Sequence, residues 1–245
     1  MVLGVIPARY NSIRLRNKLL VNIGGHPLIY YTWKQAKKAS AIDALVVATD
    51  SEIIANEVRL FGGEVIMTPP NIRTGSDRVA VAAKRFLQFK PDIVVNIQGD
   101  EPLIPPGAIN KAVKIIEENP EILMSTVATS FDKMENINNP NLVKVVIDKE
   151  GNALYFSRSK IPHFSTKDAK YLKHVGIYAF EREFLFKYVK LSQTPLEKSE
   201  KLEQLRVLEN GIKLRVIVGK YKTQEVNTRS DLQIARKLIA KNEKK

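Results

Sequence analysis

Short apolar segments that alternate with helix-like segments constrain the fold of this 245-residue chain more than any other feature. Four of these segments are rich in β-branched residues and predict strands buried on both faces: 2–6, 44–49, 64–67 and 92–97. Apolar residues at helical spacing fill the intervals between them. This alternation predicts an α/β fold with a Rossmann-like, predominantly parallel, doubly wound sheet.

The pattern changes after residue 136. Segments 142–148 and 153–156 predict two strands around a turn, and 171–180 predicts a further strand. We therefore expect a single domain over 1–245 with a β-rich excursion at roughly 136–180, which would provide a dimer contact. A helix over 196–210, a strand over 213–218 and a final helix from Ser230 are expected to return to the α/β pattern.

The composition excludes several classes of protein. The chain has no cysteine, which rules out disulfides, zinc–thiolate sites and thiol nucleophiles. No apolar run approaches the ~20 residues that span a bilayer, and the first apolar stretch is too short for a signal peptide, so we expect a cytosolic protein without membrane insertion. The net charge of +13 indicates an anionic partner, which can be nucleic acid, anionic lipid or a small polyanion.

Four cationic residues follow the first predicted strand: Arg9, Arg14, Arg16 and Lys18. Pro7 lacks an N–H and is expected to end that strand, which places the cations at its carboxyl end, where open α/β sheets bind ligands. The loop has neither a dinucleotide-binding glycine pattern nor a P-loop, so guanidinium and ammonium groups would supply the phosphate contacts. A solvated basic loop is the alternative, but the position favours a triphosphate site.

A second polar segment, 98–102, follows the strand at 92–97. Divalent cations that accompany a triphosphate prefer hard oxygen ligands, and Asp100 is the best candidate, because Gly99 allows close approach of the backbone. Glu101 is the second candidate, with a solvent-facing side chain as its alternative. Asp100 by itself would also suit a residue that caps the loop.

Four stretches in combination resemble the 3-deoxy-manno-octulosonate (KDO) cytidylyltransferase family. They are the first loop, with Ile6-Pro7-Ala8-Arg9, Ser12, Arg14 and Lys18, and the segments 73–78, 96–102 and 202–206. The resemblance implies a Mg²⁺-dependent nucleotidyltransferase that transfers CMP from CTP to the anomeric C2 hydroxyl of KDO, with release of pyrophosphate. It also implies a cytoplasmic homodimer that serves lipopolysaccharide biosynthesis.

The resemblance further assigns roles by position. It implies catalytic roles for Arg9, Lys18 and Asp100. The nucleotide-binding set that it implies is Ala8, Arg9, Arg14, Lys18, Arg73, Ser76 and Gln98. The sugar-binding set is Arg158, His174, Tyr178, Glu203 and Gln204, of which Arg158 or His174 would receive the carboxylate. The implied metal ligands are Asp100 and Asn227.

Asn227 departs from the family pattern, which has an aspartate in the motif Val-Asp-Thr-Pro at this point. The amide oxygen of asparagine can still face a metal but brings no charge, and we expect Asp231 to cap or pair within its own helix. The predicted sugar-site residues also have ordinary interpretations. Glu203 and Arg206 would suit an exposed helix pair, and His174 and Tyr178 would suit ordinary sheet positions.

Two other functions remain open from the sequence. One is another sugar-acid nucleotidyltransferase, because such enzymes are similar in the first loop. The other is a basic nucleic-acid-binding protein, which the net charge favours. Aromatic residues make up only 7% of the chain, and no basic stripe with interleaved aromatics is present, which argues against single-strand binding.

Overall fold

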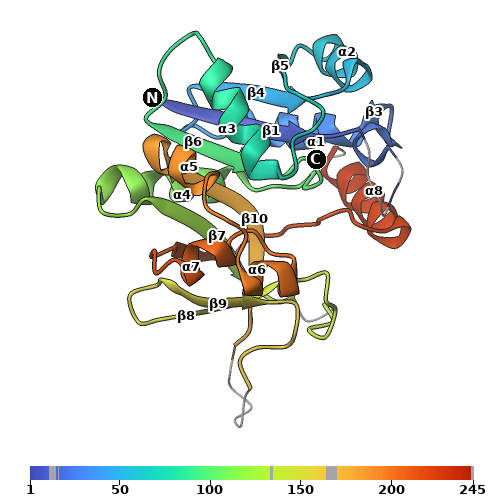
Figure 1. Cartoon of the computed structure of the whole chain (residues 1–245). Coiled ribbons are helices and arrows are strands. Elements are labelled where there is room, and N and C mark those ends of the chain that lie inside the picture. The colour runs from blue at the N-terminus through green and yellow to red at the C-terminus, as the bar shows by residue number, and fades with distance from the viewer. Residues whose placement is uncertain (11–14, 16, 133–134, 164–169, 244–245) are drawn as a thin grey trace.

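A computed structural model of the chain describes residues 1–10, 15, 17–132, 135–163 and 170–243. Within these ranges, nine strands form one mixed sheet in the order β11-β7-β10-β6-β1-β4-β5, with β8 and β9 attached through β10 (Figure 1). These strands are β1 Val2–Ala8, β4 Ala44–Thr49, β5 Glu64–Met67, β6 Ile93–Ile97, β7 Met124–Ser130, β8 Lys144–Ile147, β9 Ala153–Ser157, β10 Leu172–Glu181 and β11 Arg215–Gly219. A separate short pair is β2 Asn22–Ile23 with β3 His26–Pro27.

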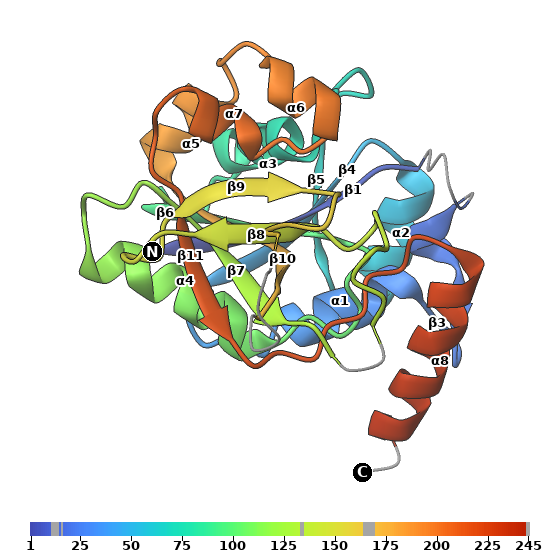
Figure 2. The same ribbon diagram turned by 90° about the horizontal axis from the view of Figure 1, so that it is seen from below.

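Helices cover both faces of the large sheet (Figure 2). They are α1 Leu28–Ala36, α2 Glu52–Leu60, α3 Gly75–Arg85, α4 Pro106–Glu118, α5 Arg182–Tyr188, α6 Pro195–Glu200, α7 Leu205–Glu209 and α8 Arg229–Glu243, with a 3₁₀ turn, η1, at Lys18–Leu20. Helices α1, α4 and α8 lie on one side of the sheet, and α3, α5, α6 and α7 lie on the other. In the described part of the chain, none of these helices is long and apolar enough to cross a membrane.

The predicted α/β fold with a mostly parallel sheet is confirmed. Strand β1 pairs in parallel with β4 and β6, β4 with β5, and β7 with β11. Strand β10 runs antiparallel between β6 and β7, and β8 pairs antiparallel with both β10 and β9. The β8–β9 hairpin is present, and β8 also pairs with β10, so this segment extends the main sheet. Its role in a dimer, and the division of the chain into one domain, stay predictions.

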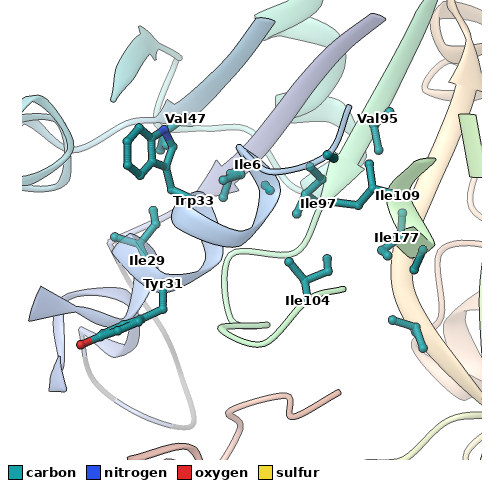
Figure 3. Packing of buried hydrophobic residues seen from close by; sticks show 14 of the residues in the cluster. Ile6, Ile29, Tyr31, Trp33, Val47, Val95, Ile97, Ile104, Ile109 and Ile177 are labelled. Carbon is teal, nitrogen blue, oxygen red and sulfur yellow. The ribbon is translucent and has the colours of Figure 1, made fainter. Parts of the chain in front are cut away.

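Alternation along β1 explains why the sheet needs helices on both faces. Val2 and Ile6 belong to one buried cluster, whereas Leu3 and Val5 belong to the other. Figure 3 shows the first cluster, in which Ile6 lies with side chains from α1, β4, β6, α4 and β10. Full burial of an aliphatic side chain stabilises a fold by about 1.5–3 kcal/mol, so these two clusters fix the sheet between its helices.

The prediction that Pro7 ends the first strand was wrong, because β1 continues to Ala8. Pairing of β1 with β6 ends at Val5 and Asn96, whereas pairing with β4 continues to Ala8 and Thr49. Pro7 therefore lies where the strand has one neighbour, and a missing N–H is tolerated at such an edge.

The single helix predicted over 196–210 was also wrong, because the segment forms two short helices, α6 and α7. A capping box of Thr194 and Glu197 begins α6, and Lys201 ends it in the left-handed conformation, with φ of 54°. The break turns residues 202–204 toward the sheet, which a continuous helix would not do.

Candidate active site

Two adjoining cavities lie at the carboxyl ends of β1 and β6. The Asn96 cavity, of about 390 Å³, is lined by residues that include Ser76, Asn96, Tyr178, Gln204 and Asn227. The Asp100 cavity, of about 720 Å³, is lined by residues that include Pro7, Lys18, Arg73, Gly99 and Asp100. Both cavities share Arg9, Gln98, Asn141, Arg158, Lys201, Glu203 and Glu225. The two cavities therefore have a common wall.

Lys18 connects the two cavities. Its ammonium group donates to the carboxylate of Asp100, and it lies 3.4 Å from Oδ1 of Asn227. The Lys18 and Asp100 side chains are only 10% and 18% exposed, and Asn227 is buried. Three residues that are far apart in the sequence thus form one polar group, the Lys18–Asp100–Asn227 cluster.

Backbone contacts hold this cluster in place. The N–H of Val226 donates to the carbonyl oxygen of Asp100 over 3.0 Å. This bond joins the segment that carries Asp100 to the segment that carries Asn227. The Asp231 carboxylate accepts from the N–H groups of Asn227, at 3.0 Å, and Thr228, at 2.8 Å. Asp231 therefore caps α8, as predicted from the sequence.

Gly99 lies just past the end of β6 and close to β1. A Cβ atom at this position would lie 3.4 Å from Ile6, Leu19 and the carbonyl oxygen of Pro7. Its own carbonyl oxygen accepts from the Thr32 hydroxyl over 2.9 Å. The backbone just before Asp100 therefore lies close to β1, in agreement with the close approach expected from the sequence.

Most of the predicted nucleotide-binding residues surround the Asp100 cavity. Arg9 and Arg73 are exposed at its wall, whereas Ala8 is buried at the end of β1. Gln98 packs against Gly176, where a Cβ atom would lie only 2.6 Å from Cγ of Gln98. Arg14, together with Ser12 and Arg16, lies outside the described residues.

The N-terminus of α3 meets Glu203. Thr74 caps this helix by accepting from the Asp77 N–H over 3.1 Å. Glu203 accepts hydrogen bonds from Ser76 and from the backbone of Gly75, yet burial has the larger effect and raises the pKa of Glu203. The helix N-terminus thus holds a carboxylate inside the Asn96 cavity.

Arg206 has a different partner from the one considered in the sequence. It donates from Nε to the Glu197 carboxylate over 2.8 Å and from the guanidinium NH₂ group over 2.5 Å, and both side chains are at most 5% exposed. The interpretation of Glu203 and Arg206 as an exposed helix pair is therefore wrong. The buried Glu197–Arg206 pair joins α6 to α7 and frees Glu203 to face the cavity.

Comparison with known proteins identifies the family. The family model described as Cytidylyltransferase matches residues 3–214. The 3-deoxy-manno-octulosonate cytidylyltransferase of Fusobacterium nucleatum is 45% identical over 241 residues, which cover 98% of this chain and 97% of that protein. The protein of the same description from Arabidopsis thaliana, designated mitochondrial, is 46% identical over 236 residues, which cover 95% of this chain and 81% of that protein.

A solved structure agrees with these relatives. The CMP:2-keto-3-deoxy-manno-octonic acid synthetase complexed with CTP superposes with a TM-score of 0.90 at 36% identity, covering 98% of this chain and 99% of that one. The chain belongs to the 3-deoxy-manno-octulosonate cytidylyltransferase family. The family resemblance predicted from the four stretches is thereby confirmed.

The residues predicted to bind the family's sugar acid lie around the Asn96 cavity. Nε2 of His174 lies 2.9 Å from the Thr126 hydroxyl, and burial lowers the pKa of His174 to about 3. His174 is therefore neutral near pH 7 and cannot serve as a cation for a carboxylate. Tyr178 lies beside it, with ring centroids 5.3 Å apart.

Arg158 lines both cavities but already has several partners. It donates to the backbone carbonyls of Glu200 over 2.8 Å and Pro140 over 2.9 Å, with Lys201 at 3.5 Å. These contacts fix the guanidinium group relative to the end of α6, and its remaining donors face the cavities.

Sequence reasoning missed two polar residues of the Asn96 cavity. Asn96 is 1% exposed in the central strand β6, and its Oδ1 has no hydrogen-bond partner within the described structure. Lys173 is buried and pairs with Glu135. An asparagine inside an otherwise apolar central strand is the signal that could have found the first of them, because a buried polar atom without a partner is costly.

Glu101 does not face solvent, so that alternative was wrong. Its side chain is 5% exposed, and its Oε2 has no hydrogen-bond partner within the described structure. Burial raises the pKa of Glu101 well above its ordinary value, and the nearby charges of Glu225 and Asp100 raise it further. It lines the Asn96 cavity, not the Asp100 cavity.

The residues that would face a metal are few. Over the described ranges, no three side chains of the His, Cys, Asp and Glu types come together as a metal site. The oxygens of Asp100 and Asn227 nevertheless converge on one cation, the Lys18 ammonium. The pair therefore fits a Mg²⁺ ion that takes its other ligands from substrate oxygens and water, as Mg²⁺ commonly does.

Proposed function

We propose that this chain activates KDO by transferring CMP from CTP to its anomeric C2 hydroxyl, which yields CMP-KDO and pyrophosphate for lipopolysaccharide biosynthesis. The observation that carries this proposal is the position of the Lys18–Asp100–Asn227 cluster. Asp100 and Lys18 line one cavity, and Asn227 lines the other. The Lys18 ammonium contacts the side chains of both Asp100 and Asn227. A reaction that joins two substrates needs such a meeting point.

The triphosphate would lie in the Asp100 cavity. Arg9 and Lys18 would bind its phosphates, with Arg14 assisting, because guanidinium and ammonium groups neutralise phosphate oxygens. They would also stabilise the charge that develops on the departing pyrophosphate. Ala8, Arg73, Ser76 and Gln98 would frame the cytidine, although Ser76 lines the Asn96 cavity.

The sugar acid would lie in the Asn96 cavity. Tyr178 and neutral His174 would bind hydroxyl groups as hydrogen-bond partners. Glu203 and Gln204 would bind further hydroxyls, and the Nε2 of Gln204 is buried without a partner within the described structure. Because His174 is neutral, Arg158 is the residue of the predicted sugar-binding set that would bind the KDO carboxylate as a cation.

We further propose that the reaction depends on Mg²⁺ held by Asp100 and Asn227. When bound, the ion would supply Lewis-acid polarisation at the phosphate and hydroxyl oxygens. The protein residues would hold the hydroxyl in line with the phosphorus and exclude water from the shared wall of the cavities.

A homodimer that uses the β8–β9 hairpin, and a cytosolic location, also stay proposals. Leu154 on β9 is 60% exposed, as an apolar residue in a subunit contact would be in a single chain. One relative carries a mitochondrial designation, so location varies among similar proteins.

The decisive assay measures pyrophosphate release from CTP in the presence of KDO and Mg²⁺, with CTP alone as the control. KDO-dependent release supports the proposal. Release with a different sugar acid or nucleotide would favour another nucleotidyltransferase. Salt-sensitive retention on DNA or RNA without CTP-dependent release would favour the nucleic-acid-binding function.

A further inference from the structure

Lys18 occupies the position that a divalent cation would need. Its ammonium contacts both the Asp100 carboxylate and the Asn227 amide oxygen. With one positive and one negative charge, the cluster is already neutral, since Asn227 adds no charge. A divalent ion placed beside it would add two positive charges next to an ammonium in a largely buried site, which is unfavourable at low local dielectric.

The backbone prevents the cluster from opening easily. Val226 is bonded to the Asp100 carbonyl, and Asn227 is held by the Asp231 carboxylate. Asp100 and Asn227 therefore stay about the same distance apart. The repulsion between a divalent ion and the ammonium can then be reduced only if the long, flexible side chain of Lys18 moves away. A triphosphate allows this movement, because its oxygens in the same cavity attract the ammonium away from Asp100.

We propose that Lys18 is a built-in competitor of the metal at Asp100, so that this chain binds its divalent cation only together with the triphosphate. The nucleotide supplies the missing negative charge and draws Lys18 toward its phosphates. The Asp100 carboxylate and the Asn227 oxygen then become free for the metal. The proposal rests on the proposed function only for the identity of the triphosphate.

Mn²⁺ serves as the probe, because its free fraction is read directly by electron paramagnetic resonance without any turnover. The full chain without nucleotide is expected to bind Mn²⁺ with a Kd weaker than ~1 mM, the weak end of carboxylate sites. Asn227→Asp adds a carboxylate without changing shape and should tighten Kd on the order of tenfold. Lys18→Met removes the competing charge and should also tighten it.

Matched controls separate this effect from general charge. Asn56→Asp makes the same exchange at an exposed position of α2, and Lys114→Met removes an exposed lysine that pairs with Glu118 on α4. Both should leave the Kd for Mn²⁺ unchanged. Thermal melts check folding, and Lys18→Gln, which also removes the charge but keeps a polar side chain, carries the test if Lys18→Met proves unstable.

Reciprocal binding provides the second measurement. Equilibrium dialysis of labelled CTP against the wild-type chain should show affinity at least ~10-fold higher with Mn²⁺ than without it, because linked sites affect each other equally. The proposal is overturned if the free wild-type chain binds Mn²⁺ below ~0.1 mM or if Lys18→Met leaves the Kd unchanged. Neither result depends on KDO, so the failure of the proposed function would be seen separately, in the pyrophosphate assay.

Discussion

The backbone N–H of Val226 donates to the carbonyl oxygen of Asp100 over 3.0 Å. This contact joins the end of β6 to the segment that enters α8, and it places Asn227 beside the side chain of Asp100. Lys18, the first residue of the 3₁₀ turn η1, then reaches both side chains. The reaction centre thus depends on three chain segments that only the folded sheet brings together.

Asp100→Asn should remove most of the turnover and leave the fold intact. The change keeps the shape of the side chain but removes the one charge that pairs with Lys18 and would face the metal. Loss of a preorganised charge at a reaction centre typically lowers kcat by about 10²-fold or more. Pyrophosphate release measures kcat, and circular dichroism and a thermal melt check the fold. A near-normal kcat would show that the assignment of Asp100 is wrong.

His174 should make the protein less stable at mildly acidic pH. Burial holds its pKa at about 3 in the folded chain, against an ordinary value of 6.5, so between these values the unfolded chain binds more protons. Stability is complete above pH 6.5 and is lost as pH falls toward 3. Because the side chain is partly exposed to the cavity, we expect a loss on the order of 1 kcal/mol between pH 7 and pH 5.

Urea unfolding of wild type and His174→Gln at pH 7 and pH 5 isolates this contribution. The variant should lose less stability than the wild type over the same interval. Glu101 and Glu203, whose raised pKa values act in the opposite direction, are present in both proteins and cancel in the comparison. Equal losses in the two proteins would contradict the prediction.

Arg206→Met should destabilise the fold by about 3–5 kcal/mol, because it leaves the Glu197 carboxylate buried without its partner. Adding Glu197→Gln to this variant should recover part of the loss, as it removes the orphaned charge. Glu203→Gln is the control for the alternative in which Arg206 pairs with Glu203. Arg206→Met should lower the free energy of unfolding by the same amount with Glu203→Gln present as without it. Chemical denaturation measures the wild type and each of these single and double variants. A double variant no more stable than Arg206→Met would argue against the buried pair.

Asn96→Val should separate stability from substrate binding. It removes a buried acceptor that has no partner within the described structure, so the free energy of unfolding should rise by about 1 kcal/mol. The KM for KDO should rise at least ~10-fold while the KM for CTP stays unchanged, since Asn96 lines only one cavity.

Thr126→Val on strand β7 of the same sheet is the matched control. Thr126 is also buried, but its hydroxyl donates to the Ile177 carbonyl over 2.7 Å. Its loss should therefore lower stability by about 1 kcal/mol. A stability loss with Asn96→Val, or equal changes in both KM values, would contradict a role for Asn96 in sugar binding.

The strand and helix pattern was accessible from the sequence because each buried strand repeats the same local signal. Strands β4 and β5 have the predicted bounds. The errors at Pro7 and in the 196–210 segment have one cause. Each depends on which neighbours a residue has, and local propensity does not contain that information.

The sequence by itself determined the class of the sheet, the family, and which residues form the charged loop after the first strand. Periodicity, composition and motif order are properties of the chain and need no tertiary structure. Only the tertiary structure decided that Lys18 lies between Asp100 and Asn227, that Glu101 is buried, that His174 is neutral, and that Arg206 pairs with Glu197. These outcomes depend on burial and on contacts between distant segments. Desolvation and Coulomb interactions act through space, so no single stretch of sequence specifies them.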